Sequence, residues 1–130
     1  MYDVIIIGAG VVGCSVAREI SKYKANVLVL ERGNDVAFGA TKANSGIVHA
    51  GFDAKPGTKK AYFNVKGAMM YPKLHKELDF PYRKNGALVL SFDDNGKETI
   101  DELLQRAKQN KVKGCELIYK EKIKFLICLC

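Results

Sequence analysis

The sequence has little that would mark a membrane-spanning or secreted protein. Its apolar run at residues 123–130 is much shorter than the roughly 20 apolar residues that a membrane-spanning helix needs. Its four cysteines form no disulfide framework of the secreted type. The N-terminal apolar stretch passes directly into glycines, unlike a signal peptide. We therefore expect a cytoplasmic protein with no transmembrane segment, while peripheral contact with a membrane stays open.

Acidic residues are in the minority. The chain carries 21 Lys and Arg residues against 14 Asp and Glu residues, a net charge of +7, and many of the cations fall between residues 55 and 84. Such a region is typical of a solvated surface, of a surface that steers an anionic substrate, or of a nucleic-acid interface. No recognised nucleic-acid motif accompanies it, and Tyr62 and Phe63 have helix-core spacing rather than that of a base-stacking platform. We expect a solvated surface first, anion steering second, and no nucleic-acid partner.

A glycine motif after an apolar run is the most informative feature that is present. Residues 4–7 form an unbroken β-branched run, which predicts a strand covered on both faces. Gly8, Gly10 and Gly13 then follow in G-x-G-x-x-G spacing. The first permits a tight turn, the second lets a diphosphate approach the backbone, and the third lets a helix pack closely on the sheet. The N-terminus of that helix would direct N–H groups at the phosphates.

The helix and the strand after it complete a βαβ pattern. Apolar residues at helical spacing are expected to face the sheet, namely Val12, Val16, Ala17 and Ile20. A second strand at residues 26–30 is followed by Glu31, where an acid can bind a ribose hydroxyl. Its carboxylate would repel a 2′-phosphate, and Arg32 is the only nearby basic residue that could accept one. The pattern therefore predicts a dinucleotide with a free 2′-hydroxyl, and Glu31 alone leaves both NAD and FAD open.

The segment at residues 39–51 is small, polar and rich in glycine. Thr41, Asn44 and Ser45 supply hydroxyl and amide groups, and Gly46 lets the backbone approach a flat ring or a phosphate. Because this segment follows the second strand directly, it favours FAD over NAD.

The N-terminal unit and the stretch from Ala40 to Gly51 together resemble the FAD-dependent oxidoreductases of the D-amino-acid oxidase superfamily. Within it, the chain is most similar to FAD-dependent glycerol-3-phosphate dehydrogenase and L-2-hydroxyglutarate oxidase. The likeness continues through residues 81–90 to about Ile118. It implies FAD as the cofactor and a small anionic hydroxy compound as the substrate, with glycerol 3-phosphate ahead of L-2-hydroxyglutarate. A hydride would pass from that substrate to the flavin.

The resemblance also implies roles for individual residues. The glycine turn would lie at the pyrophosphate, Glu31 at the adenosine ribose, and the polar segment along the phosphates and the ribityl chain. His49 is the candidate acid–base residue beside the flavin, because imidazole exchanges a proton near neutral pH. The alternative is a histidine that only hydrogen-bonds a loop. The implied cofactor-binding residues are Gly8, Gly10, Val12, Gly13, Glu31, Arg32, Thr41, Asn44, Ser45 and Gly46.

The fold class expected is α/β. Residues 1–80 would form a Rossmann-like FAD-binding part, and residues 81–122 would begin a second, antiparallel-sheet substrate domain. The tail at 123–130 departs from the family pattern and is expected to be frayed or non-native. Its Cys128 and Cys130 do not amount to a metal site, because two thiols are too few ligands.

Further elements follow from the local patterns. A helix capped by Thr58 is expected, with a kink or a restart at Pro72. A strand at residues 87–92 would be closed by a turn at 93–96, and a short amphipathic helix would follow. Another strand is expected at residues 115–119.

Members of the family are much longer than 130 residues, so the chain is expected to be an N-terminal portion of an enzyme. Three hypotheses stay open. The chain is the FAD-binding part of a flavoprotein dehydrogenase or oxidase, an inactive nucleotide-binding fragment, or a module that pairs with a separately encoded C-terminal remainder.

Overall fold

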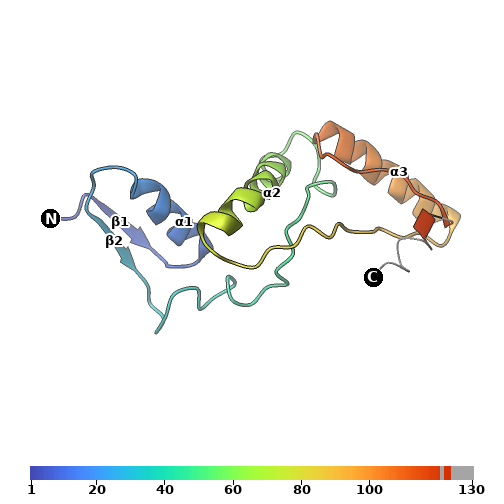
Figure 1. Ribbon diagram of the computed structural model, residues 1–130. Coiled ribbons are helices and arrows are strands. Elements are labelled where there is room, and N and C mark those ends of the chain that lie inside the picture. Colours follow the sequence, from blue (N-terminus) through green and yellow to red (C-terminus); the bar gives the residue numbers. More distant parts are fainter. Residues whose placement is uncertain (121, 124–130) are drawn as a thin grey trace. The chain divides into compact units, whose positions relative to one another are not determined.

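The computed structural model describes residues 1–120, 122 and 123, without the side chains of residues 94 and 95. Its helices and strands, in chain order, are β1 (Val4–Ile7), α1 (Val11–Ile20), β2 (Val27–Leu30), α2 (Lys59–Glu77) and α3 (Asp94–Gln109) (Figure 1). The chain divides into two compact units. The first unit is Met1–Ile47, and the second unit starts at Val48.

The first unit is a βαβ unit, as the sequence predicts. Strands β1 and β2 pair in parallel, with Val4 opposite Val27 and Ile7 opposite Leu30. The pairing continues beyond the strands, because the N–H of Gly8 donates to the carbonyl of Leu30 at 2.7 Å. Helix α1 connects the two strands and packs on both of them (Figure 1). The Rossmann-like α/β fold class is confirmed.

The face that α1 turns to the sheet differs from the expected one. Val12 is 75% exposed and Val16 is also exposed, so the expectation that these two face the sheet is wrong. Gly13, Ala17 and Ile20 are the partly buried residues on that side. Gly13 sets the face, because its missing side chain lets α1 approach the carbonyl of Gly8. The helix is therefore rotated so that its smallest residue lies nearest the sheet.

Only one face of β1 is covered by the described residues. Val4 and Ile6 are partly buried, whereas Ile5 is 55% exposed and Ile7 is 88% exposed. The expected strand with two covered faces is therefore wrong for this chain. A parallel strand buried on both sides needs a second layer, and the described residues provide only α1.

Helix α2 begins and ends close to the predicted positions. Thr58 caps it, since its hydroxyl accepts a hydrogen bond from the N–H of Ala61 at 3.2 Å. The helix runs without a restart through Pro72 to Glu77, so the expected restart does not occur. A proline removes one intrahelical hydrogen bond. The helix continues past Pro72 because the 13 helical residues before it already form the regular hydrogen-bond pattern.

The turn expected at residues 93–96 is wrong, because these residues form the N-cap and the first turn of α3. Asp93 is the N-cap of the helix, and its side chain accepts from the N–H of Gly96 at 2.7 Å. Asp and Asn favour turns and helix caps for the same reason, because their short side chains accept from nearby backbone N–H groups. The predicted amphipathic helix is present and begins earlier than expected.

The strands expected at residues 87–92 and 115–119 are not formed. The described residues from 81 to 93 and from 110 to 119 contain no strand. Leu88, Val89 and Leu90 are each about half exposed. A β-strand is stabilised by a paired neighbour, and these segments have none among the described residues. The antiparallel sheet expected for 81–122 is therefore not formed by the described residues of that segment.

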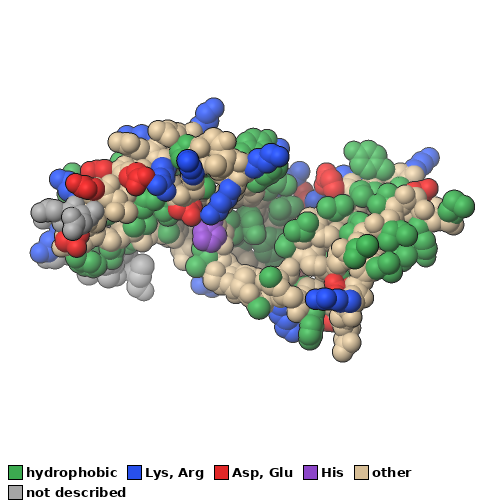
Figure 2. Space-filling view, turned by 180° about the vertical axis from the view of Figure 1, so that it is seen from behind, with side chains coloured by type: hydrophobic (Ala, Val, Ile, Leu, Met, Phe, Trp, Pro, Cys, Tyr) green, Lys and Arg blue, Asp and Glu red, His purple; other side chains and the backbone are tan. Residues whose placement is uncertain are grey.

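Few residues are buried in either unit. Among the residues that the structure describes, the buried hydrophobic ones are Ala9, Ala54, Ala61 and Ala107, and no large side chain is fully buried. Figure 2 shows many hydrophobic side chains at the surface. No helix in the described part of the chain is both long and apolar enough to cross a membrane. The expectations for residues 124–130, including Cys128 and Cys130, lie outside the described residues.

Candidate functional site

A cavity of about 520 Å³ lies in the first unit, where the carboxyl ends of its parallel strands meet the glycine turn. This edge of a parallel sheet is where ligands bind in α/β folds. The ends of β1 and β2, the glycine turn and the loop after β2 form its walls. The lining residues are Ile7, Gly8, Gly10, Leu30, Glu31, Arg32, Gly33, Phe38, Gly39, Ala40 and Thr41.

The glycine turn is held open by contacts that a side chain would prevent. Gly8 has a φ of +98°, a conformation that side chains disfavour. A Cβ atom on Gly10 would lie 3.1 Å from the hydroxyl oxygen of Thr41, and one on Gly13 would lie 1.9 Å from the carbonyl oxygen of Gly8. Gly13 therefore fixes the distance between α1 and the turn, and Gly10 leaves backbone exposed to the cavity.

Glu31 is fixed at the cavity by two backbone donors. Its Oε2 accepts from the N–H of Ala9 at 2.7 Å, and its Oε1 accepts from the N–H of Gly33 at 2.9 Å. The hydrogen bond from Ala9, followed by that from Gly33, lowers the pKa of the Glu31 carboxyl below its usual value. The carboxylate is therefore ionised at neutral pH and placed where it would repel a phosphate and accept from hydroxyl groups.

Thr41 caps α1 from a distance of 30 residues along the chain. Gly10 occupies the N-cap position and has no side chain to cap the helix. The hydroxyl of Thr41 takes over, because it accepts from the N–H of Val11 at 2.9 Å. Free N–H groups at a helix N-terminus are also the groups that bind phosphates. The sequence pattern gives Thr41 as a polar loop residue and does not reveal that it caps this helix.

The loop after β2 places a residue in the cavity that the sequence pattern did not single out. Phe38 lines the cavity and is 62% exposed. The preceding Ala37 has a φ of 60°, in the left-handed region, and its N–H donates to the carbonyl of Ala9 at 2.9 Å. The Nζ of Lys42 lies 5.5 Å from the centre of the Phe38 ring. The sequence feature that could have pointed to Phe38 is an aromatic residue shortly after β2 and Glu31.

Some of the predicted cofactor residues line this cavity and others do not. Those that do are Gly8, Gly10, Glu31, Arg32 and Thr41. Val12, Gly13, Asn44, Ser45 and Gly46 are not among its lining residues.

Asn44 shapes the loop that follows the cavity. Its Nδ2 donates to the carbonyl of Thr41 at 2.6 Å, and its Oδ1 accepts from the N–H of Gly46 at 2.7 Å. Gly46 has a φ of +65° and completes this turn.

His49 belongs to the second unit and is exposed. Two residues later, the chain is tied to the end of α3. The Nδ2 of Asn110 donates to the carbonyls of Gly51 and Ala54 at 2.9 and 2.7 Å. The Nη1 of Arg106 donates to the carbonyl of Asp53 at 3.2 Å. Helix α3 therefore fixes residues 51–54, a contact between segments more than 50 residues apart that the sequence pattern did not predict.

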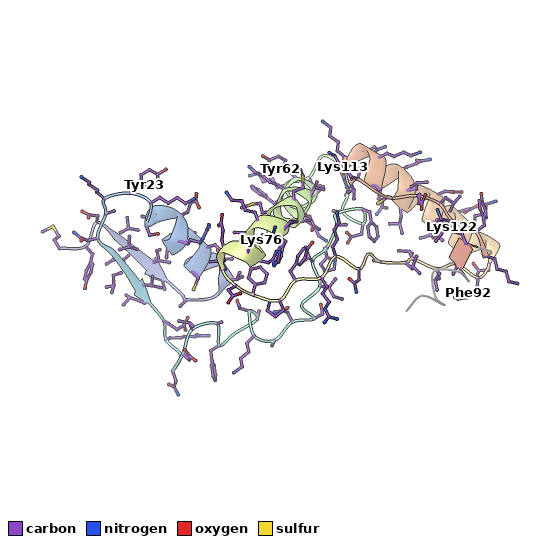
Figure 3. The ribbon with its side chains drawn as sticks, viewed as in Figure 1. Tyr23, Tyr62, Lys76, Phe92, Lys113 and Lys122 are labelled. Carbon is purple, nitrogen blue, oxygen red and sulfur yellow. The ribbon has the colours of Figure 1, made fainter. Side chains whose placement is uncertain are left out.

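The second unit contains a larger and more basic cavity, of about 640 Å³. Its walls come from α2 and from residues 109–113, and Figure 3 labels Tyr62 and Lys113 on these two segments. Lys66, Lys111 and Lys113 line it, with no acidic residue among the lining residues. The charge fits the anion-steering interpretation of the basic region as well as that of a solvated surface.

No group of three or more His, Cys, Asp or Glu residues that could hold a metal ion occurs in the residues described.

This chain is similar to a family of known proteins. The family model for FAD dependent oxidoreductase, DAO, matches residues 3–126. Glycerol 3-phosphate dehydrogenase of Caloramator mitchellensis is 51% identical over 123 residues, which are 95% of this chain and 26% of that protein. The mitochondrial L-2-hydroxyglutarate dehydrogenase of Caenorhabditis elegans is 33% identical over 124 residues, 94% of this chain and 29% of that protein.

A solved structure is similar as well. The dithionite-reduced L-alpha-glycerophosphate oxidase of Mycoplasma pneumoniae with FAD bound superposes with a TM-score of 0.78 at 33% sequence identity. The match covers 86% of this chain and 29% of that one. The chain thus spans between a quarter and a third of the length of these relatives.

Proposed function

The chain belongs to the DAO family of FAD-dependent oxidoreductases, and on this premise we propose that its N-terminal part binds FAD for a dehydrogenase or oxidase. One observation carries the proposal. The bare backbone of Gly10, the N-terminus of α1 and the ionised Glu31 line or adjoin one cavity at the carboxyl ends of two parallel strands. An adenosine diphosphate group needs that combination, because its phosphates require N–H donors and its ribose hydroxyls require an acceptor.

The residues of this chain have separate roles in the proposal. Gly8 and Gly10 of the glycine turn, with Val12 and Gly13 in the first turn of α1, hold the pyrophosphate. Glu31 accepts hydrogen bonds from the adenosine ribose, with Arg32 beside it. The polar loop is the proposed contact for the phosphates and the ribityl chain, through Thr41, Asn44, Ser45 and Gly46.

His49 is the proposed acid–base residue. An imidazole can take up and release a proton near neutral pH, and no other residue between Lys42 and Gly51 can do so. When bound, FAD accepts the hydride; the protein orients the reactants and exchanges the proton. The alternative stays a histidine that only hydrogen-bonds its loop.

We propose a small anionic hydroxy compound as the substrate of the whole enzyme, with glycerol 3-phosphate first. The 51% identity with a glycerol 3-phosphate dehydrogenase supports this choice, and the basic residues of the second unit fit an anion. L-2-hydroxyglutarate is the second candidate, because dehydrogenases for it are also among the relatives.

The domain division proposed for this chain is an FAD-binding part in residues 1–80 and the start of a substrate domain in residues 81–122. Since the chain spans only 26% of its 51%-identical relative, the C-terminal remainder is a proposed partner. The exposed Ile5 and Ile7 of β1 would gain cover from it. The cytoplasmic location also stays a prediction, and cell fractionation would test it.

A titration of the purified chain with FAD, followed by flavin fluorescence, tests the cofactor. We expect weak, saturable binding and a loss of flavin on gel filtration, because the described residues leave the cavity open. Binding of NAD in preference to FAD would contradict the proposal. No turnover of glycerol 3-phosphate with an artificial acceptor is expected from this chain alone. Co-expression with the C-terminal remainder of a relative should restore flavin retention if the two parts assemble.

A further inference from the structure

We propose that Phe38 is the residue on which the adenine ring of the dinucleotide stacks, so that Phe38 sets the affinity for the adenosine half of the cofactor. This inference rests on the FAD-binding function proposed above. Phe38 lines the cavity and still exposes 62% of its surface. An aromatic ring open to a cavity offers a flat apolar face, and adenine is a flat ring that gains free energy by stacking on such a face.

The position of Phe38 beside Glu31 supports adenine rather than another ring. A Cβ atom on Gly33 would lie 3.4 Å from the Oε1 of Glu31 and 3.5 Å from the Cβ of Phe38. The carboxylate and the aromatic side chain therefore approach the same point of the loop. In an adenosine group, the base is attached to the ribose whose hydroxyls Glu31 would bind, so the base must lie next to that carboxylate.

The backbone around Phe38 is held in a conformation that costs free energy. Ala37 has a φ of 60°, which a residue with a side chain adopts rarely. Its N–H donates to the carbonyl of Ala9 at 2.9 Å, and the N–H of Ala9 donates to Glu31 at 2.7 Å. The N–H of Ala9 thus fixes Glu31, and the carbonyl of Ala9 fixes Ala37, the residue before Phe38. Residues in such strained conformations cluster at active sites and ligand-binding sites.

Lys42 supports the ring from within the same loop. Its Nζ lies 5.5 Å from the centre of the Phe38 ring, within the range of a cation–π contact. This contact restricts the ring without covering it, since Phe38 stays mostly exposed. A restricted ring loses less conformational freedom when a base stacks on it.

The experiment measures the affinity of the full chain for FAD, for ADP and for inorganic pyrophosphate, which lacks the base. Phe38→Ala should weaken FAD and ADP binding roughly five- to a hundredfold, the range for loss of one base–aromatic stack. Pyrophosphate affinity should not change. Phe38→Tyr should keep most of the ADP affinity and the decrease in adenine ultraviolet absorbance that stacking produces. Phe38→Leu, which is apolar without a ring face, should lose that decrease.

Two controls separate stacking from general damage. Phe92 is 94% exposed, lies before α3 (Figure 3) and does not line the cavity, so Phe92→Ala should bind ADP like the wild type. Far-ultraviolet circular dichroism checks that each variant is folded, and Phe38→Tyr keeps the test decisive if Phe38→Ala unfolds.

Each outcome has one meaning. ADP binding by the wild type with unchanged affinity in Phe38→Ala and Phe38→Leu would overturn the stacking role and leave the proposed function standing. An equal loss of pyrophosphate affinity would also overturn it, because the ring would then act only on the fold. A wild-type chain that binds neither FAD nor ADP would overturn the proposed function itself, and the stacking role with it.

Discussion

The two units of this chain obtain their tertiary contacts in different ways. In the first unit, β1 has its pairing partner β2 only 20 residues later, and side chains of Glu31 and Thr41 tie the loop back to the glycine turn. In the second unit, residues 81–93 form no strand, and Asn110 at the end of α3 donates hydrogen bonds to the carbonyls of Gly51 and Ala54. A segment with strand-like composition therefore forms a strand only where a second strand is present to pair with it.

The substitution expected to have the largest effect is Gly13→Ala, which tests whether the first unit depends on the close approach of α1. The new Cβ would lie 1.9 Å from the Gly8 carbonyl oxygen, so helix and turn must separate. We expect a loss of about 3 kcal/mol of stability and no measurable ADP binding. Hydrogen exchange of the β1 and β2 amides measures the loss of stability, and titration with ADP measures the loss of binding.

Gly39→Ala is the matched control for that substitution. Nothing lies within 4 Å of the added Cβ, so the stability should change by less than about 0.5 kcal/mol. If Gly13→Ala behaved like Gly39→Ala, the packing described for α1 would be wrong.

The corresponding substitution in the second unit is Asn110→Ala. It removes two hydrogen bonds, to Gly51 and Ala54, at a cost of about 2 kcal/mol. Hydrogen exchange in α2 and α3 should report the loss, while ADP affinity stays as in the wild type, because the nucleotide cavity lies in the first unit. Gln109→Ala, one residue earlier, is the control and should have little effect. A fall in ADP affinity with Asn110→Ala would show that nucleotide binding also depends on the second unit.

Glu31→Gln tests, through its dependence on pH, the hydrogen bonds that hold the first unit together. The pKa of Glu31 is lowered by hydrogen bonds from Ala9 and Gly33, so its ionised form stabilises the fold above the usual value of 4.5. That contribution is lost as the pH falls through the lowered folded-state pKa. Urea unfolding above and below the usual pKa should show a smaller loss in Glu31→Gln than in the wild type. At neutral pH, ADP affinity should fall about tenfold, because the acceptor for the ribose loses its charge.

Glu19 offers a control with a different cause. Its pKa is lowered by a hydrogen bond and the charge of Lys22, on the exposed surface of α1. Added salt screens such a pair, so the contribution of Glu19 should weaken in salt while that of Glu31 persists. Equal salt sensitivity of the two would contradict the backbone origin assigned to Glu31.

A small gain in stability is expected for Gly67→Ala, in the middle of α2. Nothing lies within 4 Å of the new Cβ, and alanine favours a helix over glycine, so stability should rise by about 0.5–1 kcal/mol. Gly57→Ala is the opposite case, because Gly57 has a φ of +78°, and should cost about 1 kcal/mol. Thermal unfolding followed by circular dichroism distinguishes them.

The sequence was most informative where structure depends on near neighbours. The β1–α1–β2 order, the Thr58 cap and an amphipathic helix after Asp93 all follow from patterns within a few residues. The helix face was mispredicted, because hydrophobicity pointed to Val12 and Val16 while the small size of Gly13 decided the packing.

Long-range features of the site could not be predicted from pattern. The cap from Thr41 to α1 joins segments 30 residues apart, and the two hydrogen bonds from Asn110 to Gly51 and Ala54 join segments more than 50 residues apart. The placement of Phe38 depends on the left-handed Ala37, a conformation that no local sequence rule assigns to alanine. Strands at 87–92 and 115–119 were predicted from local apolar sequence, which carries no information on whether a pairing strand exists.

The hydrogen bonds around the glycine turn bear on how fast a cofactor can be loaded. The N–H groups of Ala9 and Val11 already have protein acceptors, in Glu31 and Thr41. A phosphate that accepts from one of these N–H groups, or a ribose hydroxyl that donates to Glu31, replaces an existing hydrogen bond and adds no further one. The rate of the proposed FAD loading should therefore depend on how readily Glu31 and Thr41 release these two N–H groups.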